Sequence, residues 1–193
     1  MKVLVTGSSR GIGKAIYDLL KQKGYDVIGC SRSSGIDVSK SEDVKKLPKD
    51  IDILINNAGI ALYKQIQDTT EEEWDNIFST NCKGMFLVTN HILPYMLQQK
   101  KGLIINLASI WGEVGGACEV AYSASKGAVI AYSKALAKEL EPSGICVKYI
   151  YPGAVNTDML KENPYGEVKG IEPEEVAEEI LEIIESKTLY KGE

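Results

Sequence analysis

The chain opens with Lys2-Val-Leu-Val-Thr6-Gly7-Ser-Ser-Arg-Gly11-Ile-Gly13, the stretch that decides its fold. Residues 2–6 are apolar and β-branched, which is typical of a strand buried in a parallel sheet. A glycine turn follows, and residues 14–23 then carry apolar side chains at helical spacing. A strand, a glycine turn and a helix in this order can hold a dinucleotide pyrophosphate at the helix N-terminus. The spacing G-x-x-x-G-x-G is not the commoner G-x-G-x-x-G, and a tightly packed βα turn is the alternative.

The same alternation continues along the chain. Strand-like runs occupy residues 2–6, 26–30, 51–55, 103–107 and 145–150, with helical patterns between them. This order predicts an α/β fold in which helices cover both faces of a parallel sheet. We expect long helices over residues 71–99, broken near Asn81, and over 122–141, and a shorter one over 173–185. A chain of 193 residues without repeats or linkers is expected to form one domain, residues 1–193.

Composition narrows the class of function. The hydrophobic fraction of 44% and charged fraction of 25% are ordinary for a soluble globular protein. A net charge of −5 gives no basic field for nucleic acid or an anionic membrane. No signal peptide or membrane span fits the sequence. Cys30, Cys82, Cys118 and Cys146 are scattered, so they predict no metal site and fit a cytoplasmic location. We read His91, the single histidine, as structural.

A second stretch points to chemistry. In Tyr122-Ser-Ala-Ser-Lys126 the phenol and the ammonium are four residues apart, so on a helix they share a face. A nearby positive charge lowers a tyrosine pKa, which suits proton exchange with a carbonyl or alcohol. Ser109 lies thirteen residues before the tyrosine. Such a pair also occurs on solvated helix faces, which is the structural alternative.

Taken in order, these motifs resemble those of the short-chain dehydrogenase/reductase family. The resemblance rests on Thr6-Gly-Ser-Ser-Arg-Gly-Ile-Gly13, Asn56-Asn-Ala-Gly59, Asn81, Ser109, Tyr122-x-x-x-Lys126 and Pro152-Gly153, and covers residues 1 to about 158. It implies a Rossmann-like doubly wound parallel sheet in three layers (αβα) and a nicotinamide cofactor.

The resemblance also implies a role for each motif. Tyr122 would donate the proton, Ser109 would hold the substrate oxygen, and Lys126 would bind ribose and lower the pKa of the tyrosine. Asn81 would break the long helix and hold a relay water, or simply satisfy backbone groups. The expected catalytic residues are therefore Asn81, Ser109, Tyr122 and Lys126. The expected cofactor-binding residues are Gly7, Ser9, Arg10, Gly11, Ile12, Gly13, Ser31, Arg32, Asp37, Asn56, Ala58, Gly59, Tyr122, Lys126, Pro152, Gly153, Val155 and Thr157.

The end of the second strand indicates which nicotinamide cofactor is bound. NAD-preferring proteins usually carry an acidic residue there that binds the ribose. Here the position reads Cys30-Ser31-Arg32, and Arg10 precedes the second glycine of the turn. Two arginines without an acid predict a 2′-phosphate site and hence NADP(H), although both arginines could be surface charges. Asp37 resembles the residue that binds the adenine amino group, or it caps a turn.

These features predict an NADPH-dependent oxidoreductase that reduces a ketone or aldehyde, similar to the 3-oxoacyl-thioester reductases. A non-catalytic NADP-binding sensor or scaffold is the alternative, and a nucleotide-sugar epimerase would need a longer chain. By resemblance, the two long helices predict a homodimer or homotetramer. A short lid over residues 157–173 contributes Met159, Leu160, Pro164 and Tyr165, and Ile60, Trp111, Val114 and Tyr151 are further candidates for the pocket or the core.

Two departures from the family pattern stand out. Only residues 33–35 separate the second strand from Ile36-Asp-Val38, and a parallel crossover needs a dozen residues or more. The usual helix at this point is therefore expected to be missing, with residues 36–38 either extended along the cofactor groove or a marginal strand. The chain also stops at Leu189-Tyr-Lys-Gly-Glu193, where relatives continue through a final strand, so it is either a minimal member or a truncated one.

Overall fold

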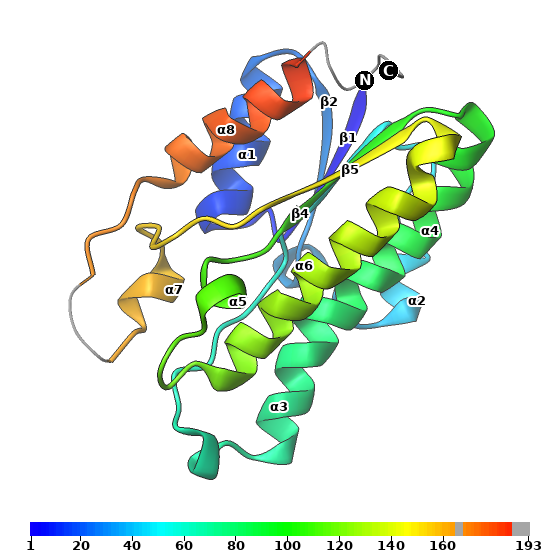
Figure 1. Cartoon of the computed structure of the whole chain (residues 1–193). Coiled ribbons are helices and arrows are strands. Elements are labelled where there is room, and N and C mark those ends of the chain that lie inside the picture. Colours follow the sequence, from blue (N-terminus) through cyan, green and yellow to red (C-terminus); the bar gives the residue numbers. More distant parts are fainter. Residues whose placement is uncertain (165–167, 187–193) are drawn as a thin grey trace.

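The computed structural model describes residues 1–164 and 168–186. Five parallel strands form one sheet in the order β2-β1-β3-β4-β5. Their bounds are β1 Lys2–Thr6, β2 Asp26–Cys30, β3 Ile53–Asn56, β4 Gly102–Leu107 and β5 Ile145–Ile150. Figure 1 shows α1 and α8 on one face of this sheet and α4 and α6 on the other. The three-layer, Rossmann-like architecture predicted from the sequence is confirmed.

The helices follow the predicted pattern closely. Helices α1 (Gly11–Gln22) and α8 (Pro173–Glu185) pack together. The opposite layer holds α4 (Met85–Gln99), α6 (Val120–Leu140) and the four-residue α2 (Ser41–Val44), and α3 (Glu71–Phe78) leads into it. Two more four-residue helices, α5 (Trp111–Val114) and α7 (Asp158–Lys161), follow β4 and β5.

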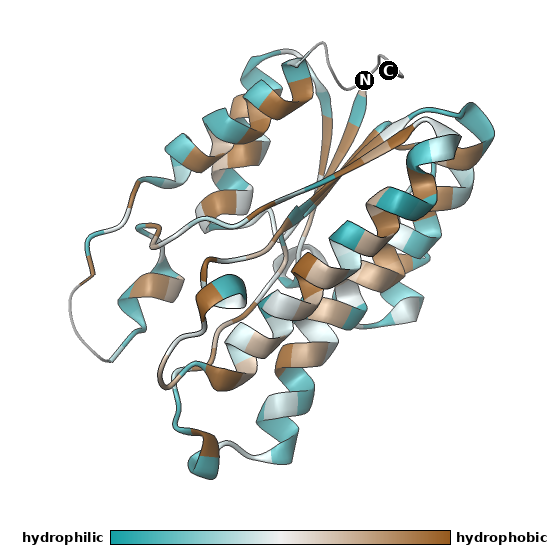
Figure 2. Cartoon of the chain, in the orientation of Figure 1, coloured by the Kyte–Doolittle hydropathy of each residue, from teal (hydrophilic) through white to brown (hydrophobic). Residues whose placement is uncertain are grey.

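Strand alternation explains the two cores. Successive side chains of a strand point to opposite faces, so Val3 and Val5 face α1 and α8 while Leu4 faces α4. In the same way Ile55 joins the first core and Leu54 the second. Because both faces are covered, the centres of β1, β3 and β4 are continuous apolar runs (residues 3–5, 53–55 and 103–105), which are brown in Figure 2.

The break in the long helix also occurs where it was predicted. Thr70 and Glu73 form a capping box that starts α3. Residues Ser79–Gly84 form a π-helical turn, with Asn81 inside it, before α4 begins. A π-helical turn contains one more residue than the i→i+4 α-helical turn and so changes the direction of the side chains that follow it. Such turns are common at functional sites.

The connection from β2 to β3 lacks a full crossover helix, as expected. Residues 31–52 contain only a 3₁₀ turn (Arg32–Ser34) and α2. Residues 36–38 form no strand; Ile36, Asp37 and Val38 run along the edge of a cavity, with Val38 buried beneath Gly84. This excludes the marginal strand. The segment lies along the cavity as the other alternative had it, but it bends into a turn in which the Lys40 N–H donates to the Asp37 carbonyl (3.0 Å). Residues 189–193, where we expected the chain to stop short of a final strand, lie outside the described residues.

Candidate active site

A cavity of about 400 Å³ lies at the carboxyl ends of the strands. Chain segments that follow all five strands line it: residues 7–13, 31–38, 57–60, 107–111 and 152–160. β2 and β3 lie on opposite sides of β1, so the order in which successive strands are added to the sheet reverses at β1. Such a switch point opens a crevice outside the strand ends, where α/β proteins bind ligands.

The glycine turn after β1 is held by close packing. Gly7 has φ +68°, and a Cβ there would lie 2.8 Å from the Cα of Ala58. The Gly7 N–H donates to the Cys30 carbonyl at 2.8 Å. Arg10, the N-cap of α1, makes no side-chain cap, and the first turn of α1 contains no acidic residue. The first N–H groups of α1 therefore carry the positive end of the helix dipole toward the cavity.

The structure places the two adjacent asparagines differently from our expectation. Asn56 does not line the cavity: its amide donates to Thr89 Oγ1 (3.1 Å) and Asn106 Oδ1 (2.9 Å) in a buried network behind the sheet edge. Asn57 lines the cavity instead, and its amide donates to the carbonyls of Thr6 (2.8 Å) and Gly7 (3.2 Å). Asn56 is the last residue of β3, so strand geometry directs it into the protein.

Arginine side chains border one part of the cavity. Arg10 and Arg32 are exposed cavity-lining residues, and neither makes an ion pair within residues 1–164 and 168–186. Ser31 lies between β2 and Arg32 and caps the 3₁₀ turn. Asp37 also lines the cavity, and its Oδ1 accepts from the backbone N–H (3.0 Å) and hydroxyl (2.7 Å) of Ser39. Asp37 thus caps a turn and still faces the cavity.

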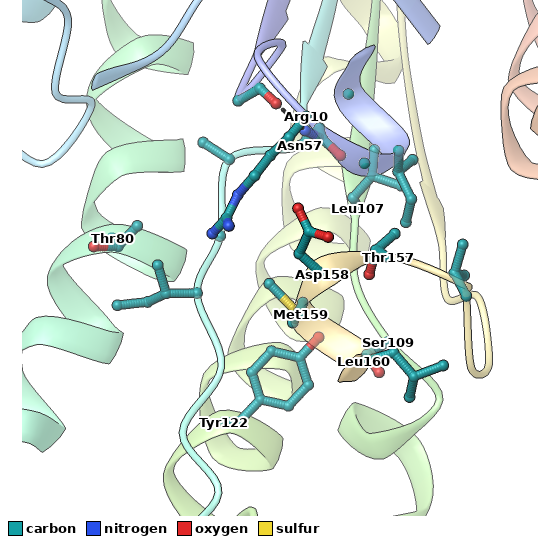
Figure 3. A pocket seen from close by; sticks show the side chains of 18 of the residues that line it. Arg10, Asn57, Thr80, Leu107, Ser109, Tyr122, Thr157, Asp158, Met159 and Leu160 are labelled. Atoms are coloured by element: carbon teal, nitrogen blue, oxygen red, sulfur yellow. Dashed lines mark hydrogen bonds between the residues drawn. The ribbon is translucent and has the colours of Figure 1, made fainter. Parts of the chain in front are cut away.

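The predicted tyrosine, lysine and serine meet in the same cavity. Tyr122 and Lys126 lie on successive turns of α6, and Ser109 follows β4. Lys126 Nζ lies 5.8 Å from the centre of the Tyr122 ring and donates to the Leu107 carbonyl at 2.7 Å. Figure 3 shows Tyr122 and Ser109 in one part of the cavity and Arg10 in another. All three predicted side chains are buried.

Burial dominates the electrostatics of this group. It raises the pKa of Tyr122 to about 12; hydrogen bonding to Ser109 acts against this shift, and Glu119 and Tyr63 reinforce it. Burial also lowers the pKa of Lys126 to about 8. The expected lowering of the tyrosine pKa by Lys126 is therefore wrong for this structure, because desolvation outweighs every nearby charge. The phenol is protonated at neutral pH.

Asn81 lies behind the cavity wall rather than in it. Its Oδ1 accepts from the Ile60 N–H (2.9 Å), and its amide donates to the Ile60 carbonyl (3.0 Å) and Ser125 Oγ (2.9 Å). A Cβ at Gly59 would lie 3.3 Å from Asn81 Oδ1 and 3.5 Å from Lys126 Nζ. Asn81 thus satisfies backbone groups, as one alternative had it, and its carbonyl lies near the lysine ammonium.

The segment after β5 closes another side of the cavity. Pro152, Gly153, Val155 and Thr157, which we expected to bind the cofactor, all line it. The two ends of the lid are joined, since the N–H of Asn156 donates to the carbonyl of Ile171 (2.8 Å) and the N–H of Ile171 to that of Ala154 (3.0 Å). Met159 and Leu160 of the lid line the cavity, whereas Tyr165 lies outside the described residues.

Sequence reasoning missed several cavity residues and misplaced two. Four residues that belong to none of the motifs also line the cavity: Tyr63, Thr80, Glu119 and Asp158. The helical spacing of Glu119, three residues before Tyr122, is the one signal that could have revealed it. Ile60 and Trp111 line the cavity as suggested. Val114 and Tyr151 do not: Val114 is 67% exposed, and Tyr151 packs on Tyr149 at 5.9 Å between ring centres.

No helix within the described parts of the chain combines the length and apolar character needed to cross a membrane.

Comparison with known proteins agrees with the fold and the motifs. The family model for the short chain dehydrogenases matches residues 35–167. The chain is 36% identical to the 3-oxoacyl-(acyl-carrier-protein) reductase of Vibrio cholerae, with 82% of this chain and 75% of that protein covered. It is also 36% identical to the NADPH-dependent pterin aldehyde reductase of Arabidopsis thaliana, with 82% and 76% covered.

Solved structures give the same result. The 3-ketoacyl-(acyl-carrier-protein) reductase of Brucella melitensis, complexed with NADH, superposes with a TM-score of 0.90 at 26% identity, covering 98% of this chain and 92% of that one. A serine dehydrogenase in its closed form, complexed with NADP⁺, superposes with a TM-score of 0.88 at 28% identity, covering 96% and 90%. With the matching family model, these similarities show that the chain belongs to the short-chain dehydrogenase/reductase family of oxidoreductases.

Proposed function

We propose that this protein is an NADPH-dependent oxidoreductase that reduces a ketone or aldehyde to an alcohol. One observation carries the proposal: a single cavity combines a protonated tyrosine, a serine and a buried lysine with two arginines that have no ion-pair partner among the described residues. Residues 1–193 would act as one cofactor-binding domain.

The residues around the glycine turn fit a dinucleotide. The open N-terminus of α1 supplies backbone N–H donors for a pyrophosphate held over Gly7, Ser9, Gly11, Ile12 and Gly13. Ala58, which packs against Gly7, and Gly59 also line the cavity and would support the adenosine.

Two arginines at this edge favour NADP(H) over NAD(H). Arg10 and Arg32 can each offer a planar charged fork to a 2′-phosphate. Ser31 is small and neutral and would not repel the phosphate, as a carboxylate at the end of β2 would. The printed name of the Arabidopsis relative includes NADPH, which supports the same preference.

At the reacting end, Lys126, Val155 and Thr157 would position the nicotinamide half. The Lys126 ammonium has three donors, and the Leu107 carbonyl accepts one of them, so two remain for ribose hydroxyls. When bound, NADPH supplies the hydride that reduces the carbonyl carbon.

Tyr122 would provide the proton. With a pKa of about 12 it holds its proton at neutral pH and can donate it to a carbonyl oxygen as negative charge develops there. Ser109 would donate a second hydrogen bond to that oxygen. After the reaction, Lys126 would pass a proton from solvent to the Tyr122 phenolate. Asn81 Oδ1 and Lys126 Nζ both lie next to Gly59.

A non-catalytic NADP-binding sensor or scaffold is the second candidate. The shortened connection between β2 and β3 favours it, because a reduced fold has less to hold a substrate. The convergence of Tyr122, Ser109 and Lys126 argues against it, since cofactor binding alone does not need a buried phenol beside a serine.

Assembly and location extend the proposal. Trp74, Phe86 and Leu97 are exposed apolar side chains on α3 and α4. We infer that this face packs against a second copy in a cytoplasmic homodimer or homotetramer, and light scattering at micromolar concentration tests it. A monomer under those conditions would contradict this inference.

The proposed activity is tested by titrating the protein with NADPH and NADH and then measuring turnover on a panel of ketones and aldehydes that includes an acetoacetyl thioester. Tight NADPH binding with turnover, and loss of turnover in Tyr122→Phe without loss of NADPH binding, is the expected result. NADPH binding without turnover on any carbonyl would support the sensor.

A further inference from the structure

Glu119 is a buried carboxylate in the cavity that the proposed reaction does not use. It occupies the N-cap position of α6, three residues before Tyr122, without a side-chain capping hydrogen bond, and only 6% of its surface is exposed. Its backbone is fully engaged, with N–H donating to the Gly116 carbonyl (3.2 Å) and carbonyl accepting from the Ser123 N–H (2.8 Å). Its carboxylate has no hydrogen-bond or ion-pair partner among the residues that the structure describes.

Lys64, Lys126 and Lys134 do not form an ion pair with Glu119. Lys64, whose backbone pairs with that of Glu119, directs its ammonium to Glu73 at 2.9 Å. Lys126 donates to the Leu107 carbonyl, and Lys134 lies 3.8 Å from Glu113. Burial raises the pKa of Glu119, and no cation among the described residues pairs with this carboxylate to offset the cost of its desolvation.

Aromatic side chains surround the same space. Tyr63, Trp111 and Tyr122 line the cavity together with Glu119, and the Tyr63 hydroxyl donates to the Met159 carbonyl of the lid at 2.8 Å. A carboxylate beside aromatic faces is the chemistry that binds an organic ammonium group: the carboxylate supplies charge and the rings supply cation–π attraction.

Glu119 is an acidic residue close to the reacting tyrosine, since its charge acts on both Tyr122 and Tyr63. Arg10, Arg32 and Asp37 line the part assigned to the cofactor, and Asp158 is paired with Lys161. A purely apolar acyl chain would leave the Glu119 carboxylate dry and unpaired, and an anionic substituent would be repelled.

We propose that the substrate is a carbonyl compound that carries a protonated amine, and that Glu119 selects it by binding the ammonium group. The inference rests on the proposed reductase activity and names its substrate class. In the reaction, the carbonyl carbon gains a hydride, the oxygen gains the Tyr122 proton, NADPH is oxidised to NADP⁺, and the ammonium group stays unchanged.

A matched pair of ketones tests this. The cationic probe is 5-(dimethylamino)pentan-2-one, whose tertiary amine is protonated at neutral pH and cannot condense with the ketone. The neutral probe is 6-methylheptan-2-one, in which a CH replaces the nitrogen. We expect wild-type kcat/KM to favour the cationic ketone by about tenfold or more, the value of one charged hydrogen bond.

Glu119→Gln keeps the shape and removes the charge, so the ratio of the two kcat/KM values is expected to fall by about tenfold. The ratio is the readout because any effect of Glu119 on the pKa of Tyr122 applies to both ketones and cancels. Glu119→Asp keeps the charge and is expected to retain part of the preference. Glu113→Gln, which removes an exposed carboxylate outside the cavity, is the matched control.

The failures are distinguishable. Equal use of both ketones by the wild type, or an unchanged ratio in Glu119→Gln, would overturn the role of Glu119 and leave the reductase activity standing. Reduction of neither ketone, nor of any other carbonyl, by protein that binds NADPH would overturn the proposed activity and this inference with it.

Discussion

Burying the Lys126 ammonium lowers the free energy of unfolding at neutral pH. Comparison with the Lys126→Met variant measures how much. The ammonium is 5% exposed, and burial lowers its pKa from about 10.5 to about 8. Because the folded protein holds this proton less tightly than the unfolded chain, the unfolded state binds more protons between pH 8 and 10.5. Stability contributed by this residue therefore rises with pH across that window.

The magnitude follows from the two pKa values. Lowering the pKa from about 10.5 to about 8, at about 1.4 kcal/mol per pH unit, corresponds to roughly 3.5 kcal/mol of destabilisation once both states are protonated. Between pH 7 and pH 10, we expect the wild type to recover about 2 to 3 kcal/mol of this relative to Lys126→Met. Methionine also removes the donor to the Leu107 carbonyl, which costs about 1 to 3 kcal/mol at every pH.

The assay is urea unfolding of both proteins at several pH values from 7 to 10, with a thiol reductant present. Because the charge of Lys126 acts on the Cys82 thiol, both proteins carry Cys82→Ala. Titration of Tyr122 and the other cysteines then contributes to both proteins, so the difference between the two unfolding free energies isolates Lys126. A difference that stays constant from pH 7 to pH 10 would refute the reasoning. It would mean that the Lys126 ammonium is as well solvated in the folded protein as in the unfolded chain.

Three further substitutions probe the cofactor edge, the site and the core. Arg32→Ala is expected to weaken NADPH binding about tenfold or more while NADH changes little, and equal losses in a fluorescence titration would remove the phosphate assignment. Ser109→Ala is expected to lower kcat about 10²- to 10³-fold with NADPH affinity retained; near-normal turnover would exclude its role. Ile104→Ala, at a side chain with 0% exposure, is expected to cost about 2 to 5 kcal/mol in urea unfolding, and a cost below 1 kcal/mol would show a poorly packed site.

Much of the fold could be predicted because it follows from local patterns. Apolar β-branched runs between helical segments predict a covered parallel sheet, and the structure places β1, β2 and β5 exactly over the predicted runs. Pro173 with its acidic neighbours predicts the start of α8 because proline and carboxylates suit the first helical turn. The short spacing after Arg32 leaves no room for a helix before Ile36, but β3 begins only at Ile53, and the connection in between contains the four-residue α2.

Side-chain direction at the strand ends was harder to predict. Asn56 and Asn57 are chemically identical neighbours, and only the pleat of β3 decides that Asn56 enters the buried network and Asn57 holds the glycine turn. Val114 and Tyr151 were candidates for the pocket because they are apolar and near motifs. The turns after β4 and β5 direct both side chains away from the cavity.

The sequence by itself determined the order of strands and helices, the glycine turn, the break near Asn81 and the face shared by Tyr122 and Lys126. Each depends on residues within a few positions of one another, whose periodicity and backbone preferences act locally. Only the tertiary structure decided that burial holds Tyr122 protonated and that the Glu119 carboxylate has no partner among residues 1–164 and 168–186. Desolvation depends on chain segments distant in sequence, such as those carrying Tyr63 and Met159, and no local pattern records which of them will enclose a given charge.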